Sequence, residues 1–349
     1  MQVLFAALTF FGALLLFGVQ PMLAKWLLPE VGGSPATWAV CMLFYQVLLL
    51  GGYAYAHLSS GRLGPRTGIR AHLALVVAAA LALVLAARGG RVELGSMLPA
   101  VAIPWLLLRR IGLPFFVLST TTPLIQRWAA GVSERSPYRL YALSNAGSLV
   151  GLLGYPFLLE PALGLEAQRT LWAGAFWLYA LGLVSAGVWV LRTTPVTAPP
   201  QPLRSDAGAR PGSPARWLAC AFVPSVMLLS ATNHITVDVA AVPLLWVVPL
   251  ALYLCTFIVA FSVWRDAWRA PVLALWIVAA VGMGWNAFAQ ARAPLWSQLG
   301  ATLLALTSSG LLCHGELARS RPASAELTRF YVWVATGGAL GGVFVGWLA

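Results

Sequence analysis

Stretches of about 20 apolar residues recur along the whole chain, and they constrain the fold more than any other feature. About 20 residues of helix cross the roughly 30 Å hydrocarbon core of a bilayer. Only 9% of the 349 residues are charged, whereas a globular domain has roughly 25%. We therefore predict an all-α polytopic membrane protein with about eleven transmembrane helices. The predicted spans are 3–24, 36–57, 71–87, 101–127, 138–160, 168–191, 217–239, 242–263, 270–289, 294–316 and 327–348.

The fourth span contains Arg109 and Arg110, which are costly in the middle of a bilayer. An alternative therefore begins this span near Ile111 and places 97–108 at the interface. Most of the 22 Lys and Arg residues fall in alternate connections, which predicts a cytoplasmic N terminus in a bacterial-type inner (plasma) membrane. The net charge of +12 then reports orientation and contact with the lipid bilayer, and a nucleic-acid partner is not expected.

Two segments 190 positions apart share one pattern: RLYALSNAGSLVG at 139–151 and RFYVWVATGGALG at 329–341. Upstream of them, Ser119 and Gln126 correspond to Ser309 and Glu316 at the same offset. A shorter match pairs Pro35, Trp38 and Tyr45 with Pro243, Trp246 and Tyr253. Both offsets equal six spans, so the copies enter the membrane in the same direction, which predicts two parallel six-helix repeats and a major-facilitator-like architecture.

Three parts follow from this repeat. We predict an N-terminal six-helix bundle at 1–192, a cytoplasmic Pro-rich linker at 193–216 and a C-terminal five-helix bundle at 217–349. Nothing after Ala349 corresponds to the sixth span, so the last helix of the second repeat is missing. Three explanations stay open: the chain is a fragment, a partner supplies the helix, or the eleven-span form is complete.

Five stretches resemble the membrane part of the fused major-facilitator/spermidine-synthase-like proteins. They are VQPMLAKWLLPEVGGSPATW (19–38), LPFFVLSTTTPLIQRW (113–128), SPYRLYALSNAGSLVGLLGYPFLLEP (136–161), TNHITVDVAAVPLLWVVPLALYL (232–254) and CHGELARSRP (313–322). The resemblance implies a transporter-like fold and, as a partner, a separate synthase-like soluble domain. GRLGPRTGIR at 61–70 resembles a cytoplasmic signature of major facilitators, but Pro65 stands where the signature has Asp, which puts a charge-paired gate there in doubt.

Ionisable groups inside spans are candidates for function because they are expensive in lipid. Lys25 and Asp238 occupy equivalent places in the two halves, so we expect an ion pair that closes one side of a central passage. The alternative is that Lys25 snorkels to the interface and Asp238 caps its helix. His234 lies one helical turn before Asp238, which suits proton coupling or a simple bond to a carbonyl.

The remaining candidates for substrate contact or gating are uncharged, or lie near helix ends. The hydroxyl groups of Ser119, Thr120 and Ser309 either line a wet cavity or bond to helix carbonyls. The glycine pairs of the repeat are expected to pack helices closely. The other candidates are Gln20, Asn145, Glu160, Asn233, His314 and Glu316. No metal site is expected, because His234 and His314 lie near opposite ends of their helices.

These features predict a secondary transporter of a small molecule, for which the resemblance implies a polyamine-like cation, working by alternating access. The alternative is a membrane anchor or scaffold for a spermidine-synthase-like (aminopropyltransferase) enzyme or domain. No nucleophile and base stand at a usable spacing, no aminopropyltransferase domain lies in the chain, and no cofactor is expected.

Overall fold

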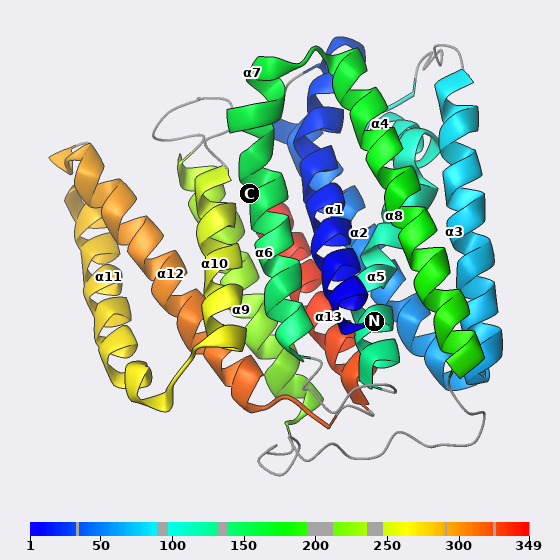
Figure 1. Ribbon diagram of the computed structural model, residues 1–349. Coiled ribbons are helices and arrows are strands. Elements are labelled where there is room, and N and C mark those ends of the chain that lie inside the picture. Colours follow the sequence, from blue (N-terminus) through cyan, green and yellow to red (C-terminus); the bar gives the residue numbers. More distant parts are fainter. Residues whose placement is uncertain are drawn as a thin grey trace. The chain divides into compact units, whose positions relative to one another are not determined.

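The protein is all-α in the residues that its computed structural model describes, which are 1–32, 35–88, 97–130, 138–193, 212–235, 247–289, 292–323 and 326–348. Each predicted span overlaps a helix or an unbroken helical run (Figure 1). The elements are α1 (Gln2–Val31), α2 (Pro35–Arg62), α3 (Pro65–Arg88), α4 (Pro99–Leu107), η1 (Leu108–Gly112), α5 (Leu113–Ala130), α6 (Tyr138–Gly154), η2 (Tyr155–Leu159), α7 (Glu160–Ala162), α8 (Leu165–Thr193), α9 (Pro214–Asn233), α10 (Val247–Ser262), η5 (Asp266–Trp268), α11 (Arg269–Ala289), α12 (Leu295–Arg319) and α13 (Leu327–Leu348).

Eight helices or helical runs in the described part of the chain are long and apolar enough to cross a membrane. The apolar helix α10 is shorter, with 16 residues. The protein is therefore an integral membrane protein with multiple spans.

Helix packing divides the chain into two compact units. Unit 1 comprises Met1–Gly208 and Ala323–Val332, and unit 2 comprises Ala209–Pro322 and Trp333–Ala349. In unit 1, α1 contacts α5, α6 and α8, while α2 packs on α5 and α3 packs on α8 (Figure 1). In unit 2, α12 contacts α9, α10 and α11. The first residues of α13 pack with unit 1, although the repeat assigns them to the second half.

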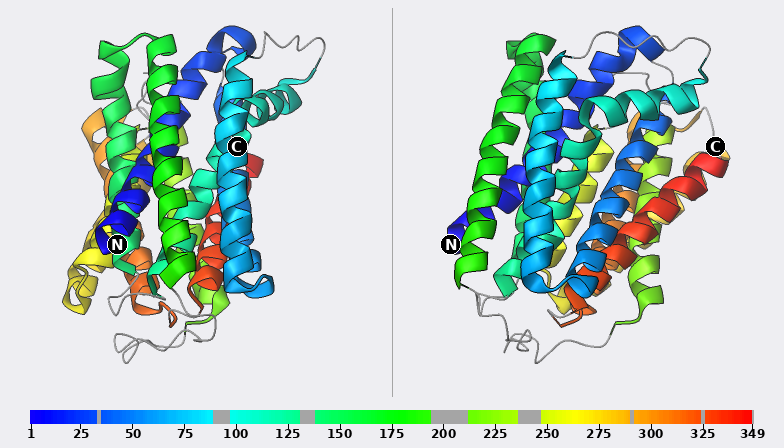
Figure 2. Two further views of the ribbon diagram at one scale, coloured as in Figure 1. Left: turned by 45° about the vertical axis from the view of Figure 1, so that its right-hand side comes forward. Right: turned by 90° about the vertical axis from the view of Figure 1, so that its right-hand side faces the viewer.

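The fourth predicted span bends where its two arginines lie. Leu108–Gly112 form a single π-helical turn between α4 and α5, and Figure 2 shows α4 inclined steeply to the helices beside it. Arg109 is exposed and Arg110 is partly exposed. The helical run is continuous from Ala100 to Ala130 and is long and apolar enough to cross a membrane, and the arginines lie at its bend.

Glycines bring two helices of unit 1 into backbone contact. A Cβ atom on Gly147 would lie 2.2 Å from the carbonyl oxygen of Phe10, and one on Gly151 would lie 2.4 Å from that of Leu14. Both glycines are on α6 and both oxygens are on α1. The predicted packing role of this glycine pair is confirmed.

The second glycine pair packs in the same way inside unit 2. A Cβ atom on Gly337 of α13 would lie 2.3 Å from the carbonyl oxygen of Leu218 on α9. A Cβ atom on Gly341 would lie 3.0 Å from that of Phe222. In each repeat, the fifth span therefore lies against the first span through the same two glycines, so the sequence repeat coincides with a repeated packing contact.

Candidate functional site

The predicted gate residue Lys25 has its ion-pair partner within unit 1. Its ammonium group bonds to the carboxylate of Glu160 at the start of α7. Both side chains are partly exposed. Asp238 lies outside the described residues, so the expected pair between Lys25 and Asp238 stays a prediction. The structure therefore pairs Lys25 with Glu160, which the sequence analysis had treated as separate candidates.

A second ion pair involves the same end of α1. Arg110 pairs with Glu30, and its guanidinium carbon lies 4.3 Å from the centre of the Trp26 ring. The guanidinium carbon of Arg169 lies 5.4 Å from the same ring. Ion pairing with Glu30 and stacking on the Trp26 ring are favourable contacts for this guanidinium group. No short-range pattern links Arg110 to Glu30, which lies 80 residues away, so the sequence reading missed this contact.

The three candidate hydroxyl groups on α5 and α12 are bonded to backbone carbonyls. Ser119 donates to the carbonyl oxygen of Phe116 at 2.7 Å and lies 3.2 Å from that of Leu48. Thr120 donates to that of Val117 at 2.7 Å. Ser309 donates to that of Leu306 at 3.0 Å. Of the two predicted uses, the structure shows local bonding to helix carbonyls.

The two candidate amide side chains of the first repeat, Gln20 and Asn145, are bound locally as well. Gln20 donates from Nε2 to the carbonyl oxygen of Leu16 at 3.3 Å, and Asn145 donates from Nδ2 to that of Tyr141 at 2.8 Å. Both side chains are buried. Asn233 is the last residue of α9, and His234 follows it.

His314 is held inside unit 2 by three side chains of α10. Its ring stacks on Phe257 with 3.5 Å between ring centres and meets Tyr253 edge-on. Its Nδ1 atom lies 2.8 Å from the hydroxyl oxygen of Thr256. The residue is fully buried.

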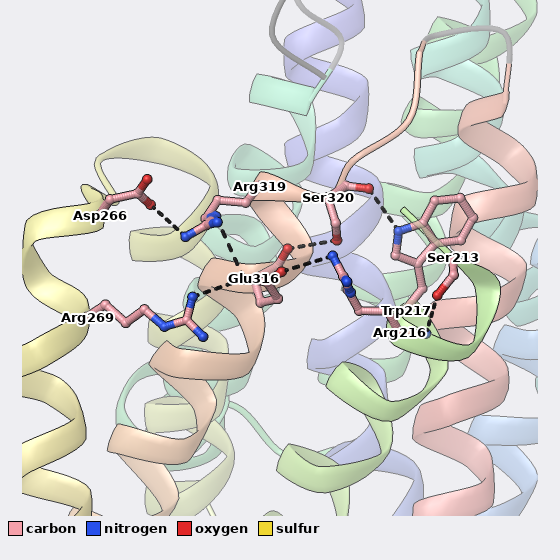
Figure 3. Close-up of polar contacts among 8 residues, drawn as sticks. All are labelled: Ser213, Arg216, Trp217, Asp266, Arg269, Glu316, Arg319 and Ser320. Carbon is pink, nitrogen blue, oxygen red and sulfur yellow. Dashed lines mark hydrogen bonds and ion pairs between the residues drawn. The ribbon is translucent and has the colours of Figure 1, made fainter. Parts of the chain in front are cut away.

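Glu316 lies two residues after His314, near the C-terminal end of α12, at the centre of a charged cluster (Figure 3). Its carboxylate lies 3.5 Å from Arg216, 3.6 Å from Arg269 and 3.7 Å from Arg319. Arg319 also pairs with Asp266 at 3.3 Å. The cluster joins α9, η5, α11 and α12, and we name it the Glu316 cluster.

The segment leading into the Glu316 cluster is fixed by a helix cap and an indole. Ser213 accepts a hydrogen bond from the backbone N–H of Arg216, and Pro214 occupies the first turn, which is a favoured N-terminal arrangement. The Trp217 indole donates to the carbonyl oxygen of Ser320 at 2.9 Å. These contacts hold the start of α9 against the end of α12, which positions Arg216 toward Glu316.

Gln126, the repeat partner of Glu316, makes a different contact. Tyr331 donates from its hydroxyl group to Gln126 Oε1 at 2.6 Å, and both side chains are fully buried within unit 1. Tyr331 also lies against its own repeat partner Tyr141, with ring centres 5.0 Å apart. His57 and Thr328 bond nearby at 3.0 Å. These contacts fix the first turns of α13 in unit 1.

We expect Tyr331→Phe to lower the free energy of unfolding by about 1–2 kcal/mol, because it leaves the buried Gln126 Oε1 without its donor. The Nε2 atom of Gln126 already has no partner among the described residues. The thermal unfolding midpoint of the purified protein measures the loss. The double variant Tyr331→Phe/Gln126→Leu is the control, because replacing both partners by apolar groups removes the unsatisfied amide. A double variant less stable than Tyr331→Phe alone would contradict the assignment.

Among the described residues, no group of three or more His, Cys, Asp or Glu side chains could hold a metal ion. The polar contacts that involve the predicted candidates include the Lys25–Glu160 pair in unit 1, His314 with Thr256 in unit 2, and the Glu316 cluster in unit 2.

The chain has the fold of the major facilitator superfamily. It resembles the proton:xylose symporter XylE of E. coli bound to 6-bromo-6-deoxy-D-glucose, with a TM-score of 0.60 and 14% identity over 99% of this chain and 87% of that one. It resembles a bacterial homologue of the iron transporter ferroportin in an outward-facing state, with a TM-score of 0.60 and 16% identity over 98% and 90%. It also resembles the human organic anion transporter MFSD10, with a TM-score of 0.55 and 16% identity over 99% and 92%.

A comparison with protein-family models gave no match, and a comparison with curated proteins gave no significant match. The structural similarity extends over nearly the whole chain and establishes the fold. The solutes in these names, a sugar, an iron ion and organic anions, belong to those proteins.

Proposed function

We propose that the protein is a secondary transporter that moves a small molecule across the membrane by alternating access. The observation that carries this proposal is the similarity of nearly the whole chain to transporters of the major facilitator fold. Two helical units made of parallel repeats are the architecture in which such transport works. Buried polar side chains within both units support the proposal, because such groups in membrane helices mark solute and ion pathways.

The proposed solute is a polyamine-like cation. This finer assignment rests on the sequence resemblance to the fused major-facilitator/spermidine-synthase-like proteins, whose soluble domain resembles enzymes that handle polyamines. The solutes named for the three similar structures differ in charge and size, so the fold alone does not choose among them. We also propose a bacterial-type inner membrane and a cytoplasmic N terminus, from the placement of the arginines.

Uptake into vesicles tests this function. Purified protein is reconstituted into lipid vesicles, and entry of labelled spermidine and labelled amino acids is measured with and without a pH gradient. We expect protein-dependent, saturable uptake of spermidine. Folded protein that takes up none of these solutes under either condition would overturn the proposal.

Asp238 is the proposed coupling group. It occupies in the second repeat the place that Lys25 occupies in the first. We expect Asp238→Asn to abolish pH-dependent uptake while the protein remains folded in the membrane. The proposed coupling step is protonation of the aspartate, and an asparagine side chain cannot be protonated in this way. Uptake in vesicles with opposite pH gradients measures the effect, and an unchanged pH dependence would remove Asp238 from the mechanism.

The second candidate function is a membrane anchor for a spermidine-synthase-like enzyme or domain, favoured by the same sequence resemblance. An anchor would bind such an enzyme and would give no protein-dependent uptake of any solute. The vesicle experiment therefore separates the two functions.

A further inference from the structure

The His314 side chain has a nitrogen atom without a hydrogen-bond partner among the residues that the structure describes. His314 is fully buried between α10 and α12. Its Nε2 atom is buried and makes no hydrogen bond to any residue that the structure describes. Buried polar atoms are nearly always hydrogen-bonded, so an unpaired one calls for an explanation.

The bonds of Thr256 determine which ring nitrogen carries the proton. The Thr256 hydroxyl group lies 2.6 Å from the carbonyl oxygen of Tyr253, which can only accept. The single hydroxyl proton is therefore used there. The bond of 2.8 Å between the hydroxyl oxygen and His314 Nδ1 then needs its proton from the histidine. In neutral imidazole this leaves a lone pair on Nε2, which is a hydrogen-bond acceptor.

The surroundings hold this acceptor in place. The ring is stacked on Phe257 at an interplanar angle of 17°, and Tyr253 meets it at 86°. A Cβ atom on Gly310 would lie 2.8 Å from the Thr256 hydroxyl oxygen, so α12 presses closely on the bonded hydroxyl group. Packing and the Thr256 bond together favour this orientation of the ring.

We propose that Nε2 of His314 is a solute-binding atom that accepts a hydrogen bond from an N–H or O–H group of the transported molecule. This inference rests on the proposed transport function. A donor group satisfies the unpaired acceptor, whereas a carboxylate oxygen repels its lone pair. Thr256 is a positioning residue, because it acts through the tautomer of His314.

Nitrogen NMR tests the proposal directly. The protein contains four histidines, and ¹⁵N-histidine-labelled protein in lipid gives their ring signals, with the His314→Gln variant identifying those of residue 314. The probes are spermidine, which carries N–H donors, and D-xylose, which carries O–H donors. Without a probe, we expect the Nε2 signal of a free lone pair. At least one probe is expected to move it toward the position of a hydrogen-bonded nitrogen.

Binding measurements supply a second readout. His314→Phe keeps a stacking ring but removes the acceptor, and it should weaken binding of the responding probe about tenfold or more. Thr256→Val keeps the side-chain shape, releases the Nδ1 proton and should give signals of both tautomers. Thr256→Ser keeps the hydroxyl group and should restore the single tautomer and the affinity.

The outcomes separate this inference from transport itself. If vesicles show uptake but neither probe moves the Nε2 signal, the inference is wrong and transport stands. If a probe moves the signal but no uptake occurs, the binding atom is correct and the transport proposal fails. A signal that is already hydrogen-bonded without a probe, as from a resident water, would also overturn the inference.

Discussion

Gly147→Leu is expected to destroy the folded protein, and Gly151→Leu is expected to act in the same way. A Cβ atom on Gly147 would lie 2.2 Å from a carbonyl oxygen of α1. The obstacle is backbone, so no side chain can rotate away and α1 must separate from α6. Helix association in lipid depends on close packing rather than on the hydrophobic effect. We expect a loss of about 3 kcal/mol or more, the upper part of the range for overpacked interiors.

Gly154→Leu is the matched control, because it places the same side chain at the end of the same helix. No atom lies within 4 Å of a Cβ atom built there. The yield of monodisperse protein in size-exclusion chromatography compares the variants. We expect Gly154→Leu to behave like the wild type and Gly147→Leu to aggregate. Equal yields of the two variants would contradict the packing role of Gly147.

Unit 2 offers the same comparison at neighbouring positions. Gly337→Leu would meet the carbonyl oxygen of Leu218, whereas a Cβ atom on Gly338 has nothing within 4 Å. We expect only the first variant to lose its folded form. Gly337 corresponds to Gly147 in the repeat. If both leucine variants lose their folded form, the same packing contact is required in each copy of the repeat.

The sequence predicted that these glycines pack helices closely, but it did not predict that their partners are α1 and α9. Apolar span length predicted the helices, and spacing by four predicted which glycines share a face. Contacts between distant segments are different, because they depend on how helices pack. The pairing of Lys25 with Glu160 and of Tyr331 with Gln126 joins positions 135 and 205 residues apart, and no local pattern encodes either one.

For the hydroxyl groups on α5 and α12, the sequence left two alternatives open: lining a wet cavity or bonding to helix carbonyls. Ser119 and Ser309 are repeat partners, which is consistent with a shared role, but a serine in a helix can always bond to a carbonyl one turn back. The structure shows that both do so. For His314, the sequence identified the residue, and only the direction of the Thr256 bond to Tyr253 identified the free acceptor.

Glu316→Gln is expected to destabilise unit 2 by about 2–3 kcal/mol. The carboxylate is the common partner of three arginines within 3.7 Å, and its side chain is 22% exposed. Loss of its charge leaves three guanidinium groups that repel one another, and Asp266 pairs with only one of them. Removing one member of a buried ion pair costs about 3–5 kcal/mol, and we lower this figure because Arg216 and Arg269 are more than half exposed.

Salt dependence distinguishes this electrostatic loss from a change in packing. The thermal unfolding midpoints of wild type and Glu316→Gln are compared at about 0.05 M and about 1 M salt, where the screening length falls to roughly 3 Å. We expect the difference to shrink at high salt, since repulsion among the partly exposed arginines is screened. Glu326→Gln is the matched control, because its exposed pair with Arg329 at 3.3 Å should contribute less than about 0.5 kcal/mol. A loss of stability independent of salt would mean that Glu316 stabilises the protein by packing. The Glu316 cluster would then not hold α9, α11 and α12 together by electrostatic attraction.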